Sequence, residues 1–247
     1  MSGPIQAHFV AAGKYHDIDF ARLEILKLMA EEPRIRATVA MDYANTDRLA
    51  ECEFLVTYTC DVMPSAAEVA ALKTFLARGG RWLALHGTNS ILRFLESGLV
   101  DAPNEAPELM ELLGTQFVAH PPIGPFTVEV PQTGDPLTRG MSDFEVVDEL
   151  YLSRTTAEIE TLMLTRFTGE ATGFVESEWK DEKVPILYRR KHGLGEIVYC
   201  TLGHCRGHYD VQVFTPFWPH PERCAWNYPI YYELMRRSLA WAAGTLE

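Results

Sequence analysis

The chain has 247 residues, of which 47% are hydrophobic and 23% are charged, and these proportions are ordinary for a globular protein with a full core. Its formal net charge of −12 argues against nucleic acid or an anionic membrane surface as the main partner, because both select for a basic face. No apolar stretch approaches the length of a membrane span, and the N-terminus lacks the basic and apolar regions of a signal peptide.

The first half of the chain alternates strand and helix patterns. Strands are predicted at residues 5–12, 35–41, 54–59 and 81–85, and helices over about 19–31 and 64–78. Ser65 and Glu68 have the spacing of a capping box at the start of the second helix, which is expected to end at Gly79-Gly80. This alternation predicts an α/β fold with a doubly wound, mainly parallel sheet and right-handed crossovers.

The second half is less regular before it returns to the same pattern. A helix is predicted over 105–113, short strands at 126–130, 144–152 and 162–166, a hairpin of 184–190 with 196–201, and a closing helix over 230–243. Because no linker-like stretch sets off the middle, residues around 115–180 are interpreted as an irregular, antiparallel insertion. We therefore predict a single domain over residues 1–247.

A histidine follows the fourth predicted strand, a continuous apolar run between glycines that is typical of a buried parallel strand. In open parallel sheets, ligands bind at the carboxyl ends of the strands, so His86 is predicted to lie where chemistry takes place. His16 follows the first strand, and His204 and His208 follow a late one. Each of these histidines alone is better explained by a structural role, but their shared edge favours a functional site.

A carboxylate and a metal ion are the further components considered for this site. Glu149 lies among apolar residues, and its burial is expected to raise its pKa, which would suit acid–base catalysis; the alternative is a salt-bridged carboxylate on an edge strand. Imidazoles with a carboxylate can bind zinc or a similar divalent ion. No H-E-x-x-H motif occurs, and glycines disfavour a helix that would pair His204 with His208. The metal and its ligands therefore stay unassigned.

The cysteines indicate the cellular compartment of the protein and do not indicate a catalytic role. They are odd in number and include no C-x-x-C pair: Cys52, Cys60, Cys200, Cys205 and Cys224. This indicates free, mostly buried thiols in a reducing compartment, and hence a cytoplasmic protein. No cysteine occupies a glycine-flanked elbow, and no phosphate-binding or dinucleotide motif is present. The Pro219-His220-Pro221-Glu222 stretch is interpreted as a proline-rich loop without function.

Several short segments, spread over nearly the whole chain, carry a family resemblance. They are Gly13-Lys14-Tyr15-His16-Asp17, Leu85-His86-Gly87, His120-Pro121-Pro122, Asp148-Glu149-Leu150-Tyr151, residues 185–204 with the Gly193-Leu194-Gly195 turn and Leu202-Gly203-His204, and the ending Ser238-Leu239-Ala240-Trp241-Ala242-Ala243-Gly244. In this order they resemble the trehalose-utilisation (ThuA-like) family. The resemblance implies a flavodoxin-like core, similar to that of class I glutamine amidotransferases, and a role with disaccharides or other glycosides, often alongside dehydrogenases that make 3-keto sugars. Glutaminase activity is not implied, since His86 stands where an amidotransferase has its cysteine.

Two hypotheses about function follow. The first is a carbohydrate-processing enzyme that acts on a (3-keto) sugar or glycoside by acid–base or metal-assisted elimination, isomerisation or hydrolysis. His86 or His204 would be the base and Glu149 its partner or the acid. The residues expected to bind the substrate are His16, Asp17, Thr88, His120 and His208. The alternative is a non-catalytic sugar-binding protein, and symmetry statistics favour a homodimer in either case.

Overall fold

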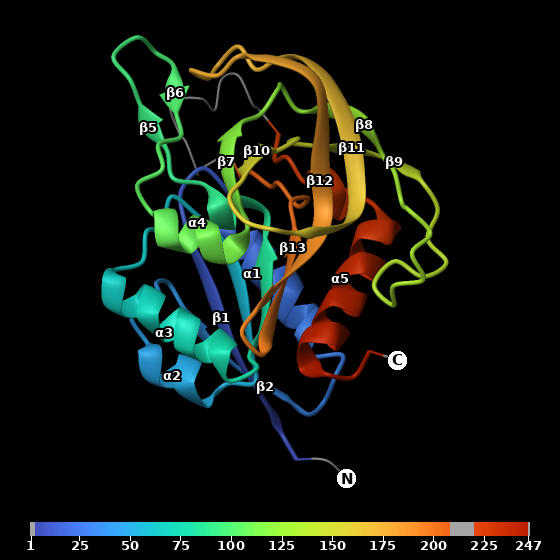
Figure 1. Cartoon of the computed structure of the whole chain (residues 1–247). Helices are drawn as coiled ribbons and strands as arrows, with labels where there is room; N and C mark the ends of the chain where they lie inside the picture. Colours follow the sequence, from blue (N-terminus) through green and yellow to red (C-terminus); the bar gives the residue numbers. More distant parts are fainter. Residues whose placement is uncertain (1–2, 208–219, 247) are drawn as a thin grey trace.

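A seven-stranded sheet forms the centre of the molecule, for which a computed structural model describes residues 3–207 and 220–246 (Figure 1). The strand order is β11-β12-β13-β4-β3-β1-β2. The parallel neighbours are β1 (Ile5–Gly13), β2 (Ile35–Ala40), β3 (Phe54–Cys60), β4 (Arg81–Leu85) and β13 (Gly195–Cys200). At one edge, β11 (Glu160–Glu170) and β12 (Glu178–His192) run antiparallel.

Helices cover both faces of the sheet and enclose two hydrophobic clusters. One face packs against α1 (Ile18–Met29) and α5 (Pro229–Ala243), and the other against α2 (Thr46–Glu51), α3 (Ala66–Ala77) and α4 (Pro107–Leu113). Because both faces are covered, every side chain of β3 is buried, which explains its continuous apolar run. The predicted flavodoxin-like, doubly wound α/β fold is confirmed.

The predicted elements of the first half agree closely with the structure. The fourth strand has the predicted bounds, and the capping box of α3 is present, with Ser65 and Glu68 each accepting a backbone N–H of the other. The sequence analysis missed α2, which Asn45 caps. Its six residues are too few to display a helical period.

The middle of the chain forms small antiparallel pairs around one end of the main sheet. These are β5 (Arg93–Phe94) with β6 (Val100–Asp101), β7 (Thr115–Ala119) with β10 (Leu152–Thr155), and β8 (Gly124–Val128) with β9 (Phe144–Asp148). The predicted hairpin is present as β12 and β13. Residues 160–170, which the sequence analysis placed in the insertion, instead form β11 of the main sheet. No helix within the described ranges is long and apolar enough to cross a membrane.

Candidate metal and substrate site

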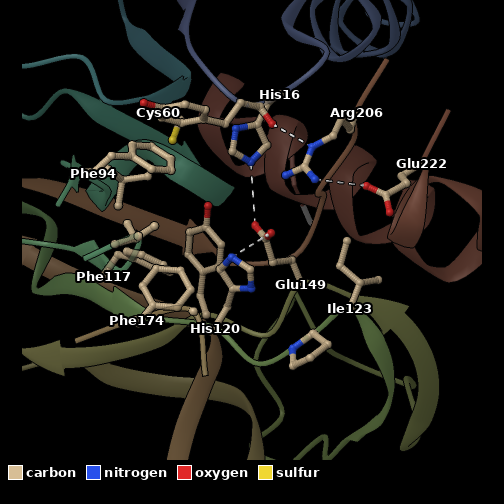
Figure 2. A pocket seen from close by; sticks show the side chains of 17 residues that line it. His16, Cys60, Phe94, Phe117, His120, Ile123, Glu149, Phe174, Arg206 and Glu222 are labelled. Atoms are coloured by element: carbon tan, nitrogen blue, oxygen red, sulfur yellow. Dashed lines mark hydrogen bonds and ion pairs between the residues drawn. The ribbon is translucent and has the colours of Figure 1, made fainter. Parts of the chain in front are cut away.

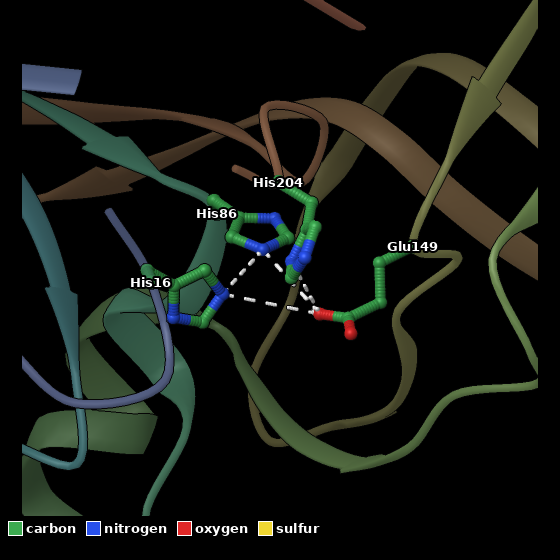
Figure 3. Close-up of side chains that lie close together, drawn as sticks. All are labelled: His16, His86, Glu149 and His204. Carbon is green, nitrogen blue, oxygen red and sulfur yellow. Dashed lines mark hydrogen bonds and ion pairs between the residues drawn. The ribbon is translucent and has the colours of Figure 1, made fainter. Parts of the chain in front are cut away.

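Side chains from four separate loops meet beyond the carboxyl ends of the central strands. They are His16, His86, Glu149 and His204, all buried, and one nitrogen or oxygen atom of each lies within 4.8 Å of the others (Figure 3). The three histidines follow β1, β4 and β13, and the carboxylate follows β9. The sheet edge at which the sequence placed the three histidines is therefore the edge at which they meet.

The backbone at His86 is strained in a way that directs its imidazole into this cluster. His86 has a φ of 44°, a left-handed conformation that costs a residue other than glycine about 1–3 kcal/mol. The next residue must be small, because a Cβ atom at Gly87 would lie 2.7 Å from the carbonyl oxygen of Thr59. His86 and Gly87 thus form a tight turn directly after β4, at the start of the short 3-10 helix His86–Asn89.

Backbone carbonyls fix the orientation of two of the imidazoles. The Nδ1–H of His86 donates to the carbonyl of Thr201 at 2.8 Å, and that of His16 donates to the carbonyl of Lys14 at 3.0 Å. The two Nε2 atoms then face each other at 2.9 Å. With both Nδ1 atoms donating, each neutral ring presents a lone pair to the other. A proton or a metal cation between the rings relieves this repulsion.

Glu149 links the cluster together. Its Oε2 lies 3.1 Å from Nδ1 of His204 and 3.5 Å from Nε2 of His86, and its Oε1 lies 3.1 Å from Nε2 of His120. Burial acts to raise the pKa of Glu149, but the surrounding imidazoles outweigh burial and hold this pKa well below its usual range. The expectation that burial would raise this pKa is therefore wrong.

The pKa values of His204 and His16 are shifted in opposite directions. Burial opposes protonation of His204, but the charge of Glu149 and contacts with Glu149 and Glu222 raise the pKa of His204 to about 9. Burial, reinforced by the neighbouring His86 and His204, holds the pKa of His16 well below its usual value. The two pKa values differ because Glu149 lies closer to His204 than to His16. Oε2 of Glu149 is 3.1 Å from Nδ1 of His204 but 3.9 Å from Nε2 of His16.

A cavity of about 610 Å³ opens onto the cluster. Figure 2 shows His16, His120 and Glu149 at its centre, with Arg206 and Glu222 beside them. His86 and His204 are fully buried and are not among the residues that line the cavity. The volume lies in the range typical of small-molecule sites.

The remaining residues predicted to bind substrate lie elsewhere. Asp17 caps α1 by accepting from the backbone N–H of Phe20 at 3.1 Å, and it pairs with Arg223 at 3.0 Å. The hydroxyl of Thr88 donates to the carbonyl of Leu85 at 2.8 Å. Neither side chain lines the cavity, so their roles in substrate binding stay predictions. His208 lies outside the described residues.

Three charged residues of the site were missed by the sequence analysis. Asp148 accepts the backbone N–H groups of Glu149 and His204, at 2.7 and 3.1 Å, and so fixes both residues in the cluster. Arg206 and Glu222 line the cavity and lie 3.7 Å apart. The Pro219-His220-Pro221-Glu222 stretch was interpreted as a loop without function, because the bridge between Arg206 and Glu222 leaves no local sequence pattern.

The four residues of the cluster fit a divalent metal ion. Zinc binds nitrogen at about 2.0–2.1 Å, which places tetrahedral ligand atoms about 3.3 Å apart. Four of the six separations are 2.9, 3.1, 3.5 and 3.9 Å, around this value, and all six lie within 4.8 Å. Carbonyl acceptors on the far ring nitrogens are also typical of metal-binding histidines. Three imidazoles and one carboxylate are suitable ligands for zinc or a similar ion.

Comparisons with known proteins agree with this fold. A family model described as trehalose utilisation (ThuA) matches residues 9–218, whereas no curated protein matches the sequence. A ThuA-like protein from Parabacteroides merdae is 14% identical, with a TM-score of 0.72, and the match covers 98% of this chain and 91% of that one. A ThuA-like protein from Bacteroides uniformis is 16% identical, with a TM-score of 0.67 and coverages of 98% and 93%.

The likeness in fold extends to a further solved structure. A protein from Thermoplasma acidophilum described as part of a GMP synthase is 10% identical, with a TM-score of 0.51, and the match covers 99% of this chain and 96% of that one. At such low identities these structural matches show the fold alone. The family model, in contrast, covers most of the sequence. The chain therefore belongs to the trehalose-utilisation (ThuA) family.

Proposed function

We propose that this protein is a carbohydrate-processing enzyme that acts on a (3-keto) sugar or glycoside by acid–base or metal-assisted elimination, isomerisation or hydrolysis. Membership of a trehalose-utilisation family supports a sugar-related role. The observation that carries the proposal is the convergence of His16, His86, Glu149 and His204 beside a cavity of small-molecule size. Such a concentration of buried ionisable groups in a hollow is typical of a catalytic site.

We further propose a divalent metal ion such as zinc as the cofactor, with the four residues of the cluster as its ligands. The facing Nε2 lone pairs of His16 and His86, 2.9 Å apart, support this assignment. Four protein ligands fill a tetrahedral site, so a bound ion would act as a Lewis acid on a substrate carbonyl only by accepting that oxygen as a fifth ligand. Because His86 and His204 are fully buried, we assign them to holding the ion, in place of the role as a substrate-contacting base that the sequence suggested.

His120 is the residue best placed to move a proton at the substrate. Its side chain is 27% exposed, and it lines the cavity with Nε2 3.1 Å from Oε1 of Glu149. A keto group acidifies the neighbouring C–H bond of a sugar, so a positioned base can start elimination or isomerisation without a covalent intermediate. Arg206 and Glu222, which line the same side of the cavity, would bind sugar hydroxyls.

Turnover tests the enzymatic part of the proposal. The purified protein is incubated with a panel of glycosides and their 3-keto forms, with and without added divalent metal. We expect conversion of at least one keto sugar, slowed by about 100-fold or more in His120→Gln and unchanged in His192→Gln, a histidine at the β12–β13 turn. If every sugar is recovered unchanged, the enzyme assignment is wrong and the sugar-binding alternative takes its place.

Metal analysis tests the cofactor. We expect the wild-type protein to hold about one equivalent of a divalent ion, and His86→Ala to hold none, because removing a ligand opens the site. His8→Ala is the matched control, since His8 is also a buried histidine but bonds to Thr38. A wild-type protein that retains no ion after incubation with zinc or manganese would exclude the proposed cofactor.

A further inference from the structure

The cavity has two chemically different halves. The polar half is lined by His16, His120, Glu149, Arg206 and Glu222, and the apolar half by Leu92, Phe94, Val100, Phe117 and Phe174. Figure 2 shows Phe94, Phe117 and Phe174 on one side of Glu149, and Arg206 and Glu222 on the other. Tyr15 and Tyr151 also line the cavity, with their rings against those of Phe94 and Phe117. The rings of Phe94, Phe117 and Phe174 themselves carry no hydrogen-bonding group.

Hydrogen bonds and ring contacts hold the apolar half of the cavity in place. The backbone N–H of Val100 donates to the carbonyl of Gly173 at 2.9 Å, and that of Val175 donates to the carbonyl of Val100 at 3.0 Å. These bonds join the β5–β6 hairpin to the segment that carries Phe174. The Phe174 ring packs edge-on against Phe117 and His120, with centroid distances of 5.7 and 4.7 Å. The aromatic wall therefore reaches the polar half at His120.

Phe94, which lines the cavity, remains open to solvent, and exposed apolar side chains follow Phe94 and Phe174 in the sequence. Phe94 is 58% exposed, and its neighbour Leu95 is 41% exposed. Val175, which follows Phe174, is 49% exposed. The Phe94 ring also contacts that of Tyr15, with centroids 5.4 Å apart. Exposed apolar side chains that are contiguous with a cavity mark a binding surface.

We infer that the substrate of this site is a glycoside with an apolar, aromatic aglycone, an inference that rests on the proposed function. The sugar ring lies over His120 and Glu149, where its hydroxyls meet charged partners. The aglycone lies against Phe94, Phe117 and Phe174. A second sugar ring in that position would find no hydrogen-bond donor or acceptor on the three phenyl rings, which disfavours it relative to an aromatic group. An aromatic ring there removes apolar surface from water and packs ring against ring.

Equilibrium binding tests the inference without requiring turnover. The probes are phenyl and methyl glucosides and galactosides in both anomeric forms, and the disaccharide trehalose, titrated into the metal-loaded protein by calorimetry. We expect a phenyl glycoside to bind about tenfold or more tightly than the methyl glycoside of the same sugar. We also expect that phenyl glycoside to bind more tightly than trehalose.

Variants locate the preference on the wall. Phe94→Ser is expected to reduce the preference for phenyl over methyl at least threefold. Leu194→Ser is the matched control, because Leu194 is 83% exposed at the β12–β13 turn and does not line the cavity. Its preference should equal that of the wild type.

Equal affinities for phenyl and methyl glycosides, tighter binding of trehalose, or an unchanged preference in Phe94→Ser would each overturn this inference. Each of these results leaves the proposed function standing, because a sugar still binds. If none of the glycosides binds, this inference fails, whereas the proposed function still stands or falls with the turnover test on 3-keto sugars. Metal content measured on the same preparation shows whether the site itself is intact.

Discussion

Two adjacent carboxylates at the end of β9 have different tasks because their surroundings differ. Asp148 accepts the backbone N–H groups of Gly203 at 2.8 Å and Ala225 at 3.3 Å, in addition to those of Glu149 and His204. Glu149 faces imidazoles. Asp148 thus joins three segments of backbone and positions the cluster, whereas Glu149 is a member of it.

Replacing Asp148 by asparagine should destabilise the protein. An amide keeps one acceptor oxygen and turns an NH2 group toward backbone N–H donors, so buried donors lose their partner. We expect Asp148→Asn to lower the free energy of unfolding by about 2–4 kcal/mol, measured by urea denaturation. In the control Asp143→Asn, an exposed residue that accepts one N–H from Val130, the loss should stay below about 1 kcal/mol. Equal losses in the two variants would contradict this role for Asp148.

At the scale of elements, the N-terminus of α3 shows how a local motif contributes to stability. The Ser65 hydroxyl accepts from the backbone N–H of Glu68, and the Glu68 carboxylate accepts from that of Ser65. We expect Ser65→Ala to lower the free energy of unfolding by about 1 kcal/mol, because one N–H of the first turn loses its acceptor. Ser142→Ala, at an exposed residue before β9, should change it by less than about 0.5 kcal/mol. A loss no larger than that control would mean that solvent replaces the cap.

The packing of α1 against α5 is reinforced by an ion pair that gives stability a pH dependence. Arg236 of α5 donates two hydrogen bonds to Glu31, just beyond α1, and these bonds lower the pKa of Glu31 below its usual value. A carboxylate with a lowered pKa in the folded state stabilises the protein above its unfolded pKa. This stabilisation is lost as the pH falls through the folded pKa.

A comparison of Glu31→Gln with the wild type checks this sign. At pH 7 we expect the variant to be less stable by under about 1 kcal/mol, because the pair is exposed to solvent. The difference should shrink as the pH falls below the unfolded pKa of a glutamate, about 4.3, and vanish below the lowered pKa of Glu31 in the folded state. Urea denaturation across this range measures it. A difference that grows toward low pH would show that another group causes the effect.

At the scale of the whole molecule, the cluster ties together residues that are distant in the sequence. His16, His86, Glu149 and His204 come from loops after β1, β4, β9 and β13. An ion bound by all four would therefore stabilise the folded state as a whole, because the unfolded chain cannot assemble the same ligands. This consequence can be measured without a substrate.

Chelation should lower the thermal midpoint of the protein. With the ion in about 100-fold excess over its dissociation constant, binding contributes about 2.7 kcal/mol, which corresponds to a shift of about 5–10 °C for a domain of this size. We expect EDTA to remove this shift from the wild type and from the His8→Ala control, but to leave His86→Ala unchanged. Scanning calorimetry with and without zinc measures it. A wild-type midpoint that is insensitive to both zinc and EDTA would contradict the metal site.

The sequence by itself determined the alternation of strands and helices along the first half of the chain and the sheet edge that carries the histidines. Both follow from local patterns: β4 is an apolar run that ends at His86, and the capping box at Ser65 starts α3. The carboxyl ends of parallel strands lie at one edge, so loops that are far apart in the sequence meet there. The meeting of His16, His86 and His204 could therefore be predicted without knowing their distances.

Only the tertiary structure decided the protonation and the cavity access of these residues. Local sequence indicated that Glu149 is buried, but its pKa depends on the imidazoles that surround it, which come from other loops. Which histidines reach the cavity depends on packing: His16 and His120 line it, whereas His86 and His204 lie behind it. Glu222 reaches the site because its backbone forms a β-bridge with that of Arg206. Local sequence patterns determine which element and which sheet edge a side chain belongs to. Contacts with residues distant in the sequence determine its charge, its exposure and its role.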